Sequence, residues 1–315
     1  MNLKGKNFYI VVAAFVVVMV LPFFFGDSRY HMNILNLAGI FIILTYSLNF
    51  IHGYLGLISI GQAGFFAIGA YLTAGLTMGL GLNFFPSLII AAIGAAVSGV
   101  LIGFPATRIS GHYYVLITLG FGEIVRLILM NWKEVTNGTN GINNIPFPRL
   151  GPLLFDSRTS YFYLVMFFLV LTIMITVSYR RSKYGRSALA LKVSEIAGSV
   201  MGVNPLTTKL VNFGLSAFVA GIAGGLYAAY ITSISPEPFS VGLSVDVLTM
   251  LLVGGSGTIA GPIIGAAFLV VLRDSLRFLQ EYYMIIYGAG IVAVMIFMPE
   301  GIMGLIRRFT DRAKS

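Results

Sequence analysis

Residues 30–107 read YHMNILNLAGIFIILTYSLNFIHGYLGLISIGQAGFFAIGAYLTAGLTMGLGLNFFPSLIIAAIGAAVSGVLIGFPAT, and none of them is Asp, Glu, Lys or Arg. The stretch is about four times as long as the ~20 apolar residues that a helix needs to cross a bilayer. A water-soluble domain of this length needs charged side chains on its outer face. The stretch therefore predicts several membrane spans, and it indicates a multi-spanning membrane protein.

The rest of the chain has a similar composition. Hydrophobic residues make up 57% of the 315 residues and charged residues only 10%. Backbone groups in lipid must be hydrogen-bonded within the structure, and these continuous apolar runs predict helices, because the strands of a membrane barrel alternate apolar and polar residues. We expect an all-α polytopic integral membrane protein with a single transmembrane domain over 1–315. Its ten or so spans fall near 8–25, 32–51, 63–80, 84–104, 112–131, 161–179, 210–232, 244–256, 259–272 and 283–299.

The distribution of basic residues predicts the orientation. With the N-terminus inside, thirteen Lys and Arg residues fall in cytoplasmic segments and six in external ones, as expected from the cytoplasmic excess of basic residues in membrane proteins. Ten spans then leave both termini inside. The net charge of +9 follows from the same bias and gives no reason to expect nucleic-acid binding. The run 8–25 resembles a signal peptide, but more spans follow it, and we interpret it as a retained first helix.

The composition also excludes several kinds of chemistry. The chain has no Cys, which excludes disulfides, thiolate catalysis and Cys-based metal sites. The three histidines, His31, His52 and His112, stand apart and form no metal-binding pattern. No paired carboxylates at catalytic spacing, His–Glu metal motif or nucleophile elbow occurs. We therefore expect no metal, no catalytic residue and no enzymatic activity in this chain.

Two segments rich in glycine and polar residues interrupt the apolar runs. They are HGYLGLISIGQ at 52–62 and GGSGTIAGP at 254–262. Irregular backbone at membrane depth is tolerated only where protein or a water-filled cavity covers it, and paired interruptions often mark an internal repeat and the pathway of a transporter. The alternative is that small residues recur by chance in apolar sequence. The pattern leaves open whether 244–272 forms two spans or one element with a break.

The segment 180–209, predicted to be cytoplasmic, has the features of a folded loop. Ser194 followed by Glu195 is typical of a helix start, and Asn204-Pro205 is typical of a helix end. The residues between them include several apolar side chains, among them Ile196, Val200 and Met201. A short helix with an apolar face outside the membrane requires a partner surface.

At this point the sequence resembles a known family. Glu195-Ile196-Ala197 followed by Gly202 resembles the Glu-Ala-Ala loop of ABC importer permeases, although Ile196 replaces the middle alanine, Gly202 lies one position late and the usual Leu-Pro ending is missing. Four further segments resemble permeases for branched-chain amino acids, in the order and spacing of LivM-type subunits. They are GLISIGQAGFFAIGAY at 56–71, LGFGEIVR at 119–126 followed by Asn131-Trp132, GGSGTIAGP at 254–262 and MPEGIMGL at 298–305.

The resemblance, which covers about residues 37–308, implies the permease subunit of an ATP-binding-cassette importer for Leu, Ile and Val in the bacterial inner membrane. It implies a second, LivH-type permease, two ATPase subunits and a periplasmic substrate-binding protein as partners. Related permeases carry urea or other amino acids and amides, which remain the alternative substrates. Since the loop of such permeases docks on the ATPase, the resemblance implies a coupling role for Arg186, Lys192, Ser194, Glu195, Ile196, Ala197 and Gly202.

The chain itself has no phosphate-binding loop of the GxxxxGK[ST] type. We therefore expect ATP and Mg²⁺ to be bound by the partner ATPases, and no cofactor to be bound by this chain. A secondary transporter that acts alone is the alternative class, because broken segments in both halves fit it. It would need ion-coupling groups in the membrane, and Glu123 is the only acidic residue clearly within a predicted span.

Several polar residues are candidates for a translocation pathway or a gate. Glu123 and Arg126 share a helix face at i, i+3 and can pair. They would contact a zwitterionic substrate or act as a gate, or they would hold helices in register as a structural pair. We favour the structural pair, because an importer supplied by a binding protein does not need to bind substrate tightly. The other candidates, each equally suited to an interhelical hydrogen bond, are Asn49, Ser59, Gln62 and Ser256.

Overall fold

The computed structural model describes residues 29–107, 112–275, 288 and 301–304. The predicted spans 8–25 and 283–299 lie outside these residues, except for Gly288. The helices are α2 (Arg29–Leu48), the π-helical turn η1 (Asn49–Gly53), α3 (Gln62–Gly79), α4 (Phe84–Ala106), α5 (His112–Asn131), α6 (Lys133–Thr136), the 3₁₀ turn η2 (Gly138–Asn140), α7 (Arg158–Arg181), α8 (Lys183–Val193), α9 (Glu195–Val200), α10 (Pro205–Ile231), α11 (Val241–Gly254) and α12 (Gly261–Ser275).

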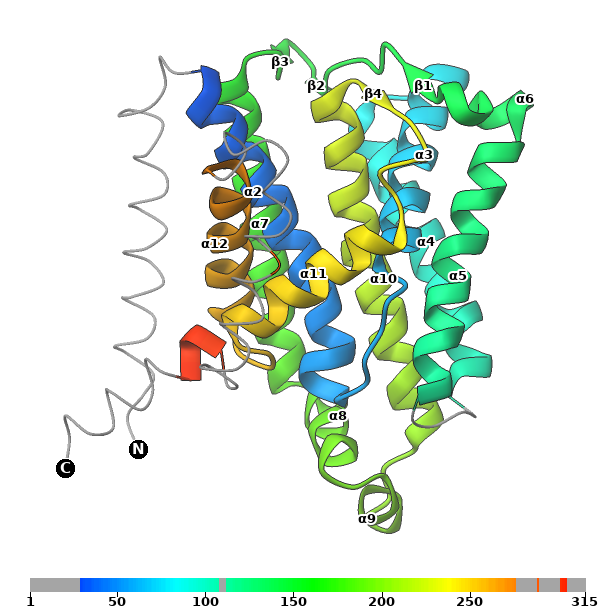
Figure 1. The fold of residues 1–315 in the computed structure, drawn as a ribbon, viewed down its shortest axis with the longest axis vertical. Coiled ribbons are helices and arrows are strands. Elements are labelled where there is room, and N and C mark those ends of the chain that lie inside the picture. The colour runs from blue at the N-terminus through cyan, green and yellow to red at the C-terminus, as the bar shows by residue number, and fades with distance from the viewer. Residues whose placement is uncertain (1–28, 108–111, 276–287, 289–300, 305–315) are drawn as a thin grey trace, which may run out of the picture.

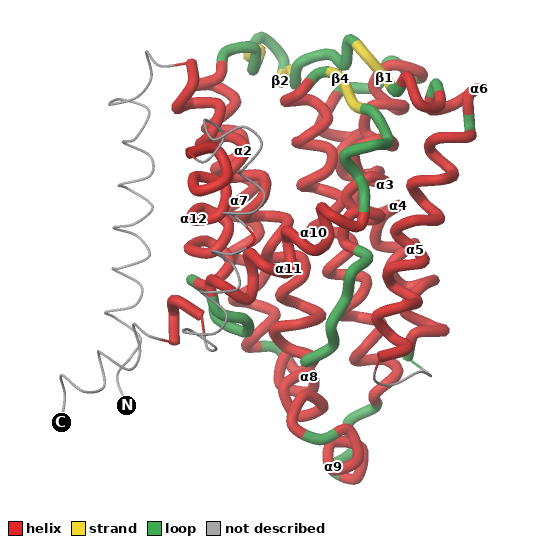
Figure 2. The backbone as a smooth tube through the Cα atoms, viewed as in Figure 1, coloured by secondary structure: helices red, strands yellow, loops and turns green. Residues whose placement is uncertain are grey.

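Strands occur only as short pairs in the described part of the chain. The strand β1 (Ile142–Asn143) pairs antiparallel with β4 (Ser233–Ile234), and β2 (Arg149–Leu150) pairs antiparallel with β3 (Leu153–Leu154). Figure 2 shows these strands together at one end of a helical bundle. The prediction of an all-α fold is confirmed.

Five of the described helices are long and apolar enough to cross a membrane. They are Arg29–Gly53, Phe84–Ala106, Tyr113–Asn131, Arg158–Arg181 and Pro205–Ile231. They match the predicted spans, and the polytopic prediction is confirmed. The helices α3, α11 and α12 lie outside this group, so the count of ten spans remains a prediction.

The ends of the long helices follow from local sequence. The side chain of Ser157 caps α7 by accepting a hydrogen bond from the N–H of Ser160 at 3.0 Å. Arg180 and Arg181 lie in the last turn of α7, where the helix dipole stabilises positive charge. Asn204 caps α10, and Pro205 follows at the first helical position. Figure 1 shows the connections with α6 and the strands at one end of the bundle, and α8 and α9 at the other.

The centre of the bundle is α10, which packs against α2, α3 and α4. Small residues allow the backbones to approach closely. A Cβ atom on Gly69 of α3 would lie 2.2 Å from the carbonyl oxygen of Gly221, and one on Gly224 of α10 would lie 2.0 Å from that of Phe66. Without glycine at these points, the helices could not pack as they do.

Two helices begin inside the bundle instead of at one of its ends. Residues 54–61 run from the end of α2 toward the middle of the bundle, where α3 starts, and the chain after α10 descends from the opposite end to the start of α11 (Figure 1). The two helix starts meet, since the N–H of Ala63 donates a hydrogen bond to Ser244 Oγ at 3.0 Å. The first predicted interruption is therefore an extended segment that leads to a short helix.

The second predicted interruption separates two helices. Residues 255–260 join α11 to α12, and we call this segment the glycine loop. The helices α11 and α12 pack against each other and against α2. The segment 244–272, which the sequence left open as two spans or one element with a break, thus lies in two helices with a turn between them, and neither is among the five helices long enough to cross a membrane.

Candidate functional site

The segment between α7 and α10 folds as two short helices joined at a single residue. Ser194 caps α9 by accepting a hydrogen bond from the N–H of Ala197 at 3.2 Å, so the predicted helix start is confirmed. The predicted end at Asn204-Pro205 is wrong. The helix ends at Val200, because Gly202 turns the chain at a φ of +83°, and Asn204 instead caps α10.

The two helices present an exposed apolar surface. Four side chains are at least 81% exposed, which leaves almost all of their apolar area in solvent, and we call them the α9 patch: Val193, Ile196, Val200 and Met201. The neighbouring Ala197 is also exposed. Figure 1 shows α9 at the extreme end of the molecule, beyond the ends of the long helices. Clustered apolar side chains that protrude in this way are typical of a protein–protein interface.

One charged residue of the segment is tied to the bundle. Glu195, at the start of α9, accepts a hydrogen bond from Lys209 Nζ at 2.7 Å. The Lys209 side chain is only 8% exposed, whereas that of Glu195 is 51% exposed. A buried ammonium requires an opposite charge, and Glu195 supplies it.

The basic residues of α8 have different partners. Lys192 Nζ donates a hydrogen bond to the carbonyl oxygen of Gly53 in η1 at 2.8 Å, and partial desolvation lowers the pKa of the Lys192 ammonium. Arg186 is exposed, and its Nη1 donates to the carbonyl oxygen of Arg181 at 2.7 Å. Lys192 therefore connects α8 to η1, whereas Arg186 bonds to the end of α7.

Asn49, a pathway candidate, is fully buried in η1 and bound to the glycine loop. Its Oδ1 accepts a hydrogen bond from the N–H of Gly257 at 2.8 Å, and its Nδ2 donates to the carbonyl oxygen of Thr258 at 3.1 Å. Tyr46, one turn earlier, donates to the carbonyl oxygen of Ile259. Ser256 is half-buried in the same loop. The side chain of Asn49 therefore replaces helical hydrogen bonds that the glycine loop lacks.

Ser59 and Gln62 are also fully buried. Gln62 Nε2 donates to Ser216 Oγ at 3.0 Å, and its Oε1 accepts from Ser47 Oγ at 3.2 Å, which ties α3 to α10 and α2. Ser59 Oγ accepts a hydrogen bond from the N–H of Gly61 at 3.4 Å. Both residues are therefore buried inside the subunit, where Gln62 joins helices and Ser59 bonds within its own segment.

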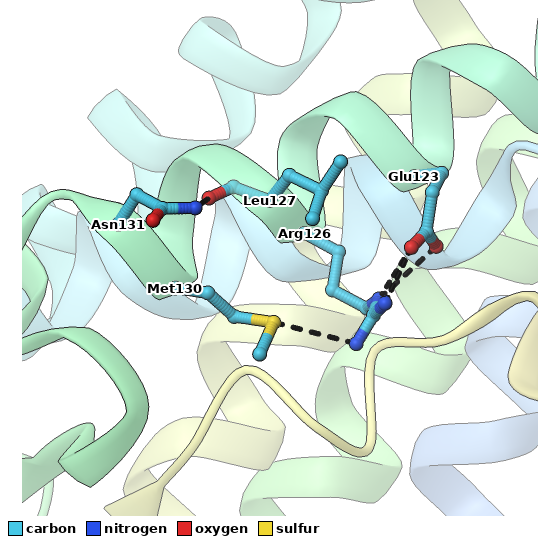
Figure 3. A network of polar contacts seen from close by, with 5 residues as sticks. All are labelled: Glu123, Arg126, Leu127, Met130 and Asn131. Carbon is cyan, nitrogen blue, oxygen red and sulfur yellow. Dashed lines mark hydrogen bonds and ion pairs between the residues drawn. The ribbon is translucent and has the colours of Figure 1, made fainter.

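Glu123 and Arg126 form an ion pair within α5. Arg126 Nε donates to Glu123 Oε2 at 3.0 Å and to Oε1 at 3.1 Å, and its Nη1 lies 3.4 Å from Met130 Sδ, as Figure 3 shows. Because both charges belong to one helix, the ion pair itself joins no two helices, and its structural role stays a prediction. The side chains are 32% and 23% exposed, so the pair lies on an open flank of α5.

The flank that carries this pair faces the loop before α11. Glu237 of that loop is near enough to interact electrostatically with Arg126. Apolar residues of α5 close to the pair are exposed as well, among them Leu116 and Ile124, and Leu116 lies two turns before Glu123 on the same side of the helix. The exposed side of α5 thus carries charge beside apolar side chains, and charge in a span is costly in lipid and marks a cavity or a protein contact.

The structure contains a further polar site that the sequence did not predict. Asp246 of α11 accepts a hydrogen bond from Arg273 of α12 at 3.3 Å. The pair borders a cavity of about 410 Å³, whose lining includes Phe41, Phe66, Tyr227 and Phe239. The available signal was one acid and one base in otherwise apolar neighbouring helices, but their contact depends on how α11 and α12 fold together.

No group of His, Asp and Glu side chains within the described ranges is arranged to hold a metal ion. His31 lies near the start of α2, and His52 lies in η1, which follows the end of that helix. The side chain of His112 lies outside the described residues.

Comparison with known proteins gives a consistent result. Residues 30–295 match the family described as "Branched-chain amino acid transport system / permease component". The chain is 38% identical to the high-affinity branched-chain amino acid transport system permease protein LivM of Escherichia coli (strain K12), over 97% of this chain and 76% of that protein. It is 37% identical, with the same coverage, to LivM of Salmonella typhimurium.

More distant permeases also match. The chain is 24% identical to the permease protein LivH of Salmonella typhimurium, over 86% of this chain and 94% of that protein. It is 28% identical to the ribose import permease protein RbsC of Escherichia coli (strain K12), over 38% of this chain and 39% of that protein. No solved structure matches.

Proposed function

The chain belongs to the family of permease components of branched-chain amino acid transport systems, and on this premise we propose that it carries Leu, Ile and Val into the cell as one subunit of an ATP-driven importer. It is a multi-pass protein of the bacterial inner membrane. The family consists of transport permeases, so the chemistry that drives transport belongs to other chains.

The observation that carries this proposal is the α9 patch. Val193, Ile196, Val200 and Met201 expose apolar surface at the end of the bundle where basic residues concentrate, which is the cytoplasmic end by the positive-inside rule. An ATPase subunit with a complementary cleft would bury this patch and gain the corresponding hydrophobic free energy. Hydrolysis of ATP on that subunit would then move α9.

The same reasoning defines the partners. We propose a pore made by this chain and a second, LivH-type permease, since this chain resembles both LivM and LivH proteins. Two ATPase subunits on the cytoplasmic side bind ATP and Mg²⁺, and a periplasmic binding protein delivers the amino acid. The large exposed apolar faces of α4 and α5 supply surface for lipid and for the second permease.

The proposed pathway runs along the charged flank of α5. Glu123 and Arg126 are partly exposed within a span, and charged side chains in that position face water or protein because exposure to lipid is costly. A zwitterionic amino acid that passes this flank would meet both a carboxylate and a guanidinium. Asn49, Ser59 and Gln62 are buried within the subunit and support the helices that border the pathway.

Two alternatives remain to be tested against this proposal. A permease for urea or another amino acid would have the same fold and the same docking patch, and only transport assays separate the substrates. A secondary transporter would not need the α9 patch. The exposed patch therefore favours the ATP-driven assembly over a transporter that acts alone.

The experiment has two steps. The tagged chain is purified gently from its native membranes, and partners in stoichiometric amounts are identified by mass spectrometry. The assembly is then placed in vesicles with its binding protein, and uptake of radiolabelled Leu, Ile, Val and urea is measured with and without ATP. A second permease, two ATPases and ATP-dependent uptake of Leu, Ile and Val are expected. Uptake driven by an ion gradient without ATP would contradict the proposal.

A further inference from the structure

The segment formed by α8 and α9, which we call the docking segment, packs on α7 and α10, and two polar contacts attach it further to the bundle. At the first, Glu195 of α9 pairs with Lys209 of α10 at 2.7 Å. At the second, Lys192 of α8 donates a hydrogen bond to the carbonyl oxygen of Gly53 at 2.8 Å. Both contacts use a lysine, and each one joins the segment to a different helix of the bundle.

The segment itself is built to move as one body. Ser194 joins α8 to α9 without a flexible linker and caps α9. Gly198 of α9 packs on α8 so closely that a Cβ atom there would lie 3.0 Å from Leu191 Cδ2. A force applied to the α9 patch is therefore passed to both attachment points.

The contact of Glu195 with Lys209 reaches α10, the central helix of the bundle. Lys209 is in the second turn of α10, the helix that packs against α2, α3 and α4. Its side chain is almost fully buried, whereas the carboxylate that neutralises its charge belongs to the docking segment. The start of α10 therefore cannot move away from α9 without leaving a buried charge unpaired.

The contact of Lys192 with Gly53 reaches η1, an irregular part of the bundle. Gly53 ends the π-helical turn η1, and a Cβ atom on it would lie 1.9 Å from Asn49 Oδ1 and 2.8 Å from the backbone nitrogen of Gly257. The stem of Lys192 also packs against Gly56, at the start of the extended segment that leads to α3. Single π-helical turns occur often at functional sites.

We propose that Lys209 and Lys192 are the positioning residues through which motion of the docked ATPase enters the membrane. This inference rests on the proposed function. Lys209 passes the movement of α9 to α10, and Lys192 passes the movement of α8 to η1, the glycine loop and the extended segment before α3. Docking removes water from Glu195 and so strengthens its attraction to Lys209, which makes the attachment firmest when the ATPase is bound.

The test uses the assembled transporter in vesicles and measures both ATP hydrolysis and uptake. The variants Lys209→Met and Lys192→Met keep the length of the side chain and remove the charge. We expect each to assemble normally and to raise the ATP hydrolysed per amino acid transported, by about tenfold for Lys209→Met and less for Lys192→Met. The matched control is Lys183→Met, which removes an exposed lysine from α8 and leaves the ratio unchanged.

A second pair of variants separates transmission from structural support. In the double variant Glu195→Lys with Lys209→Glu, the ion pair is restored in reverse, and we expect the ratio of hydrolysis to uptake to return toward that of the unaltered protein. Lys192→Arg keeps a donor for the Gly53 carbonyl and retains most of the coupling. A lysine with only a structural role would lower hydrolysis, uptake and assembly together and leave the ratio unchanged.

The outcomes distinguish this inference from the proposed function. If the unaltered assembly couples ATP hydrolysis to uptake and both Met variants keep its ratio, the linkage is overturned while the function stands. If the unaltered assembly takes up substrate without ATP, the proposed function is overturned and the linkage with it. A raised ratio in both Met variants, restored by the reversed pair, supports the linkage.

Discussion

The α9 patch and the junction of η1 with the glycine loop are opposite kinds of surface in one molecule. The patch exposes apolar side chains, and its helix is held by a local cap, one ion pair and the packing of Gly198 on α8. The junction buries polar groups, and Asn49 satisfies two of them in a segment more than 200 residues away. The patch leaves apolar side chains in solvent, whereas at the junction the polar side chain of Asn49 is paired within the chain.

This difference predicts how substitutions act in each region. A change in the patch affects what the chain does with another subunit and leaves its own fold intact. A change in the junction affects the chain itself, because buried polar groups that lose a partner destabilise the fold. Uptake and stability should therefore respond separately in the two regions.

The largest effect is expected in the patch. Ala197→Arg places a charge and a long side chain among the exposed apolar residues of α9, where an ATPase would have to bury it. We expect ATP-dependent uptake to fall by about 100-fold, as for an interface hot spot of about 3 kcal/mol. Thermal unfolding and the amount of protein in the membrane should not change, since the side chain is free in solvent within this chain.

The control for this variant is Ala190→Arg, at an exposed position of α8 outside the patch. It introduces the same side chain, and uptake should stay within about twofold of that of the unaltered protein, as is usual for a residue at the rim of an interface. If uptake remains normal in Ala197→Arg as well, α9 does not dock on the ATPase. Loss of uptake together with a lower unfolding temperature would instead place α9 in the folded interior.

The next effect tests the junction. Asn49→Leu removes the partner of the Gly257 N–H and of the Thr258 carbonyl, and each buried group that loses its bond costs about 1–3 kcal/mol. We expect a clearly lower unfolding temperature in detergent. Asn131→Leu is the matched control, because Asn131 is exposed and bonds only to Leu127 in its own helix, and we expect almost no change. Equal unfolding temperatures for the two variants would show that the junction is not a stabilising interior.

A third test concerns the flank of α5, which combines features of both regions. Glu123→Gln and Arg126→Gln each remove one charge of a partly exposed pair, so we expect a stability change below about 1 kcal/mol. If the flank borders the pathway, uptake falls about tenfold in each variant, which corresponds to about 1.4 kcal/mol. The reversed pair, Glu123→Arg with Arg126→Glu, keeps the ion pair but not the positions of its charges. Normal uptake in the reversed pair would indicate that the ion pair is only structural.

The sequence predicts these regions to different extents. The charge-free run 30–107 identifies the membrane protein, and Ser194 before Glu195 identifies the start of α9, because both signals depend on neighbouring residues. The segment 52–62 is recognised as an interruption for the same reason. Its consequence is not predictable locally, since the meeting of Ala63 with Ser244 joins residues far apart in the chain.

The same limit applies to charges. The sequence identifies Lys209 only as a cytoplasmic basic residue. Its burial against Glu195 depends on how α9 packs on α10. For Glu123 and Arg126, by contrast, the sequence predicts the contact itself. Their i, i+3 spacing predicts the contact within one helix, but the sequence does not predict that the pair is partly exposed on the outside of α5. Local spacing therefore predicts which groups can meet, and packing decides which surface they occupy.

The smallest effect compares two glycines that have open space around them. No atom lies within 4 Å of a Cβ added to Gly202, which follows α9, or to Gly75 of α3. Gly202 has a φ of +83°, so Gly202→Ala forces a left-handed conformation on an L-residue and costs about 1–2 kcal/mol. Gly75 lies within a helix, so Gly75→Ala reduces the freedom of the unfolded chain and stabilises by about 0.5–1 kcal/mol. The unfolding temperature of the assembled transporter should therefore shift in opposite directions in the two variants.

Because Gly202 sets where α9 ends, Gly202→Ala should also weaken binding of the ATPase, whereas Gly75→Ala should not. Equal ATPase binding by both variants would show that the turn at Gly202 does not position the patch.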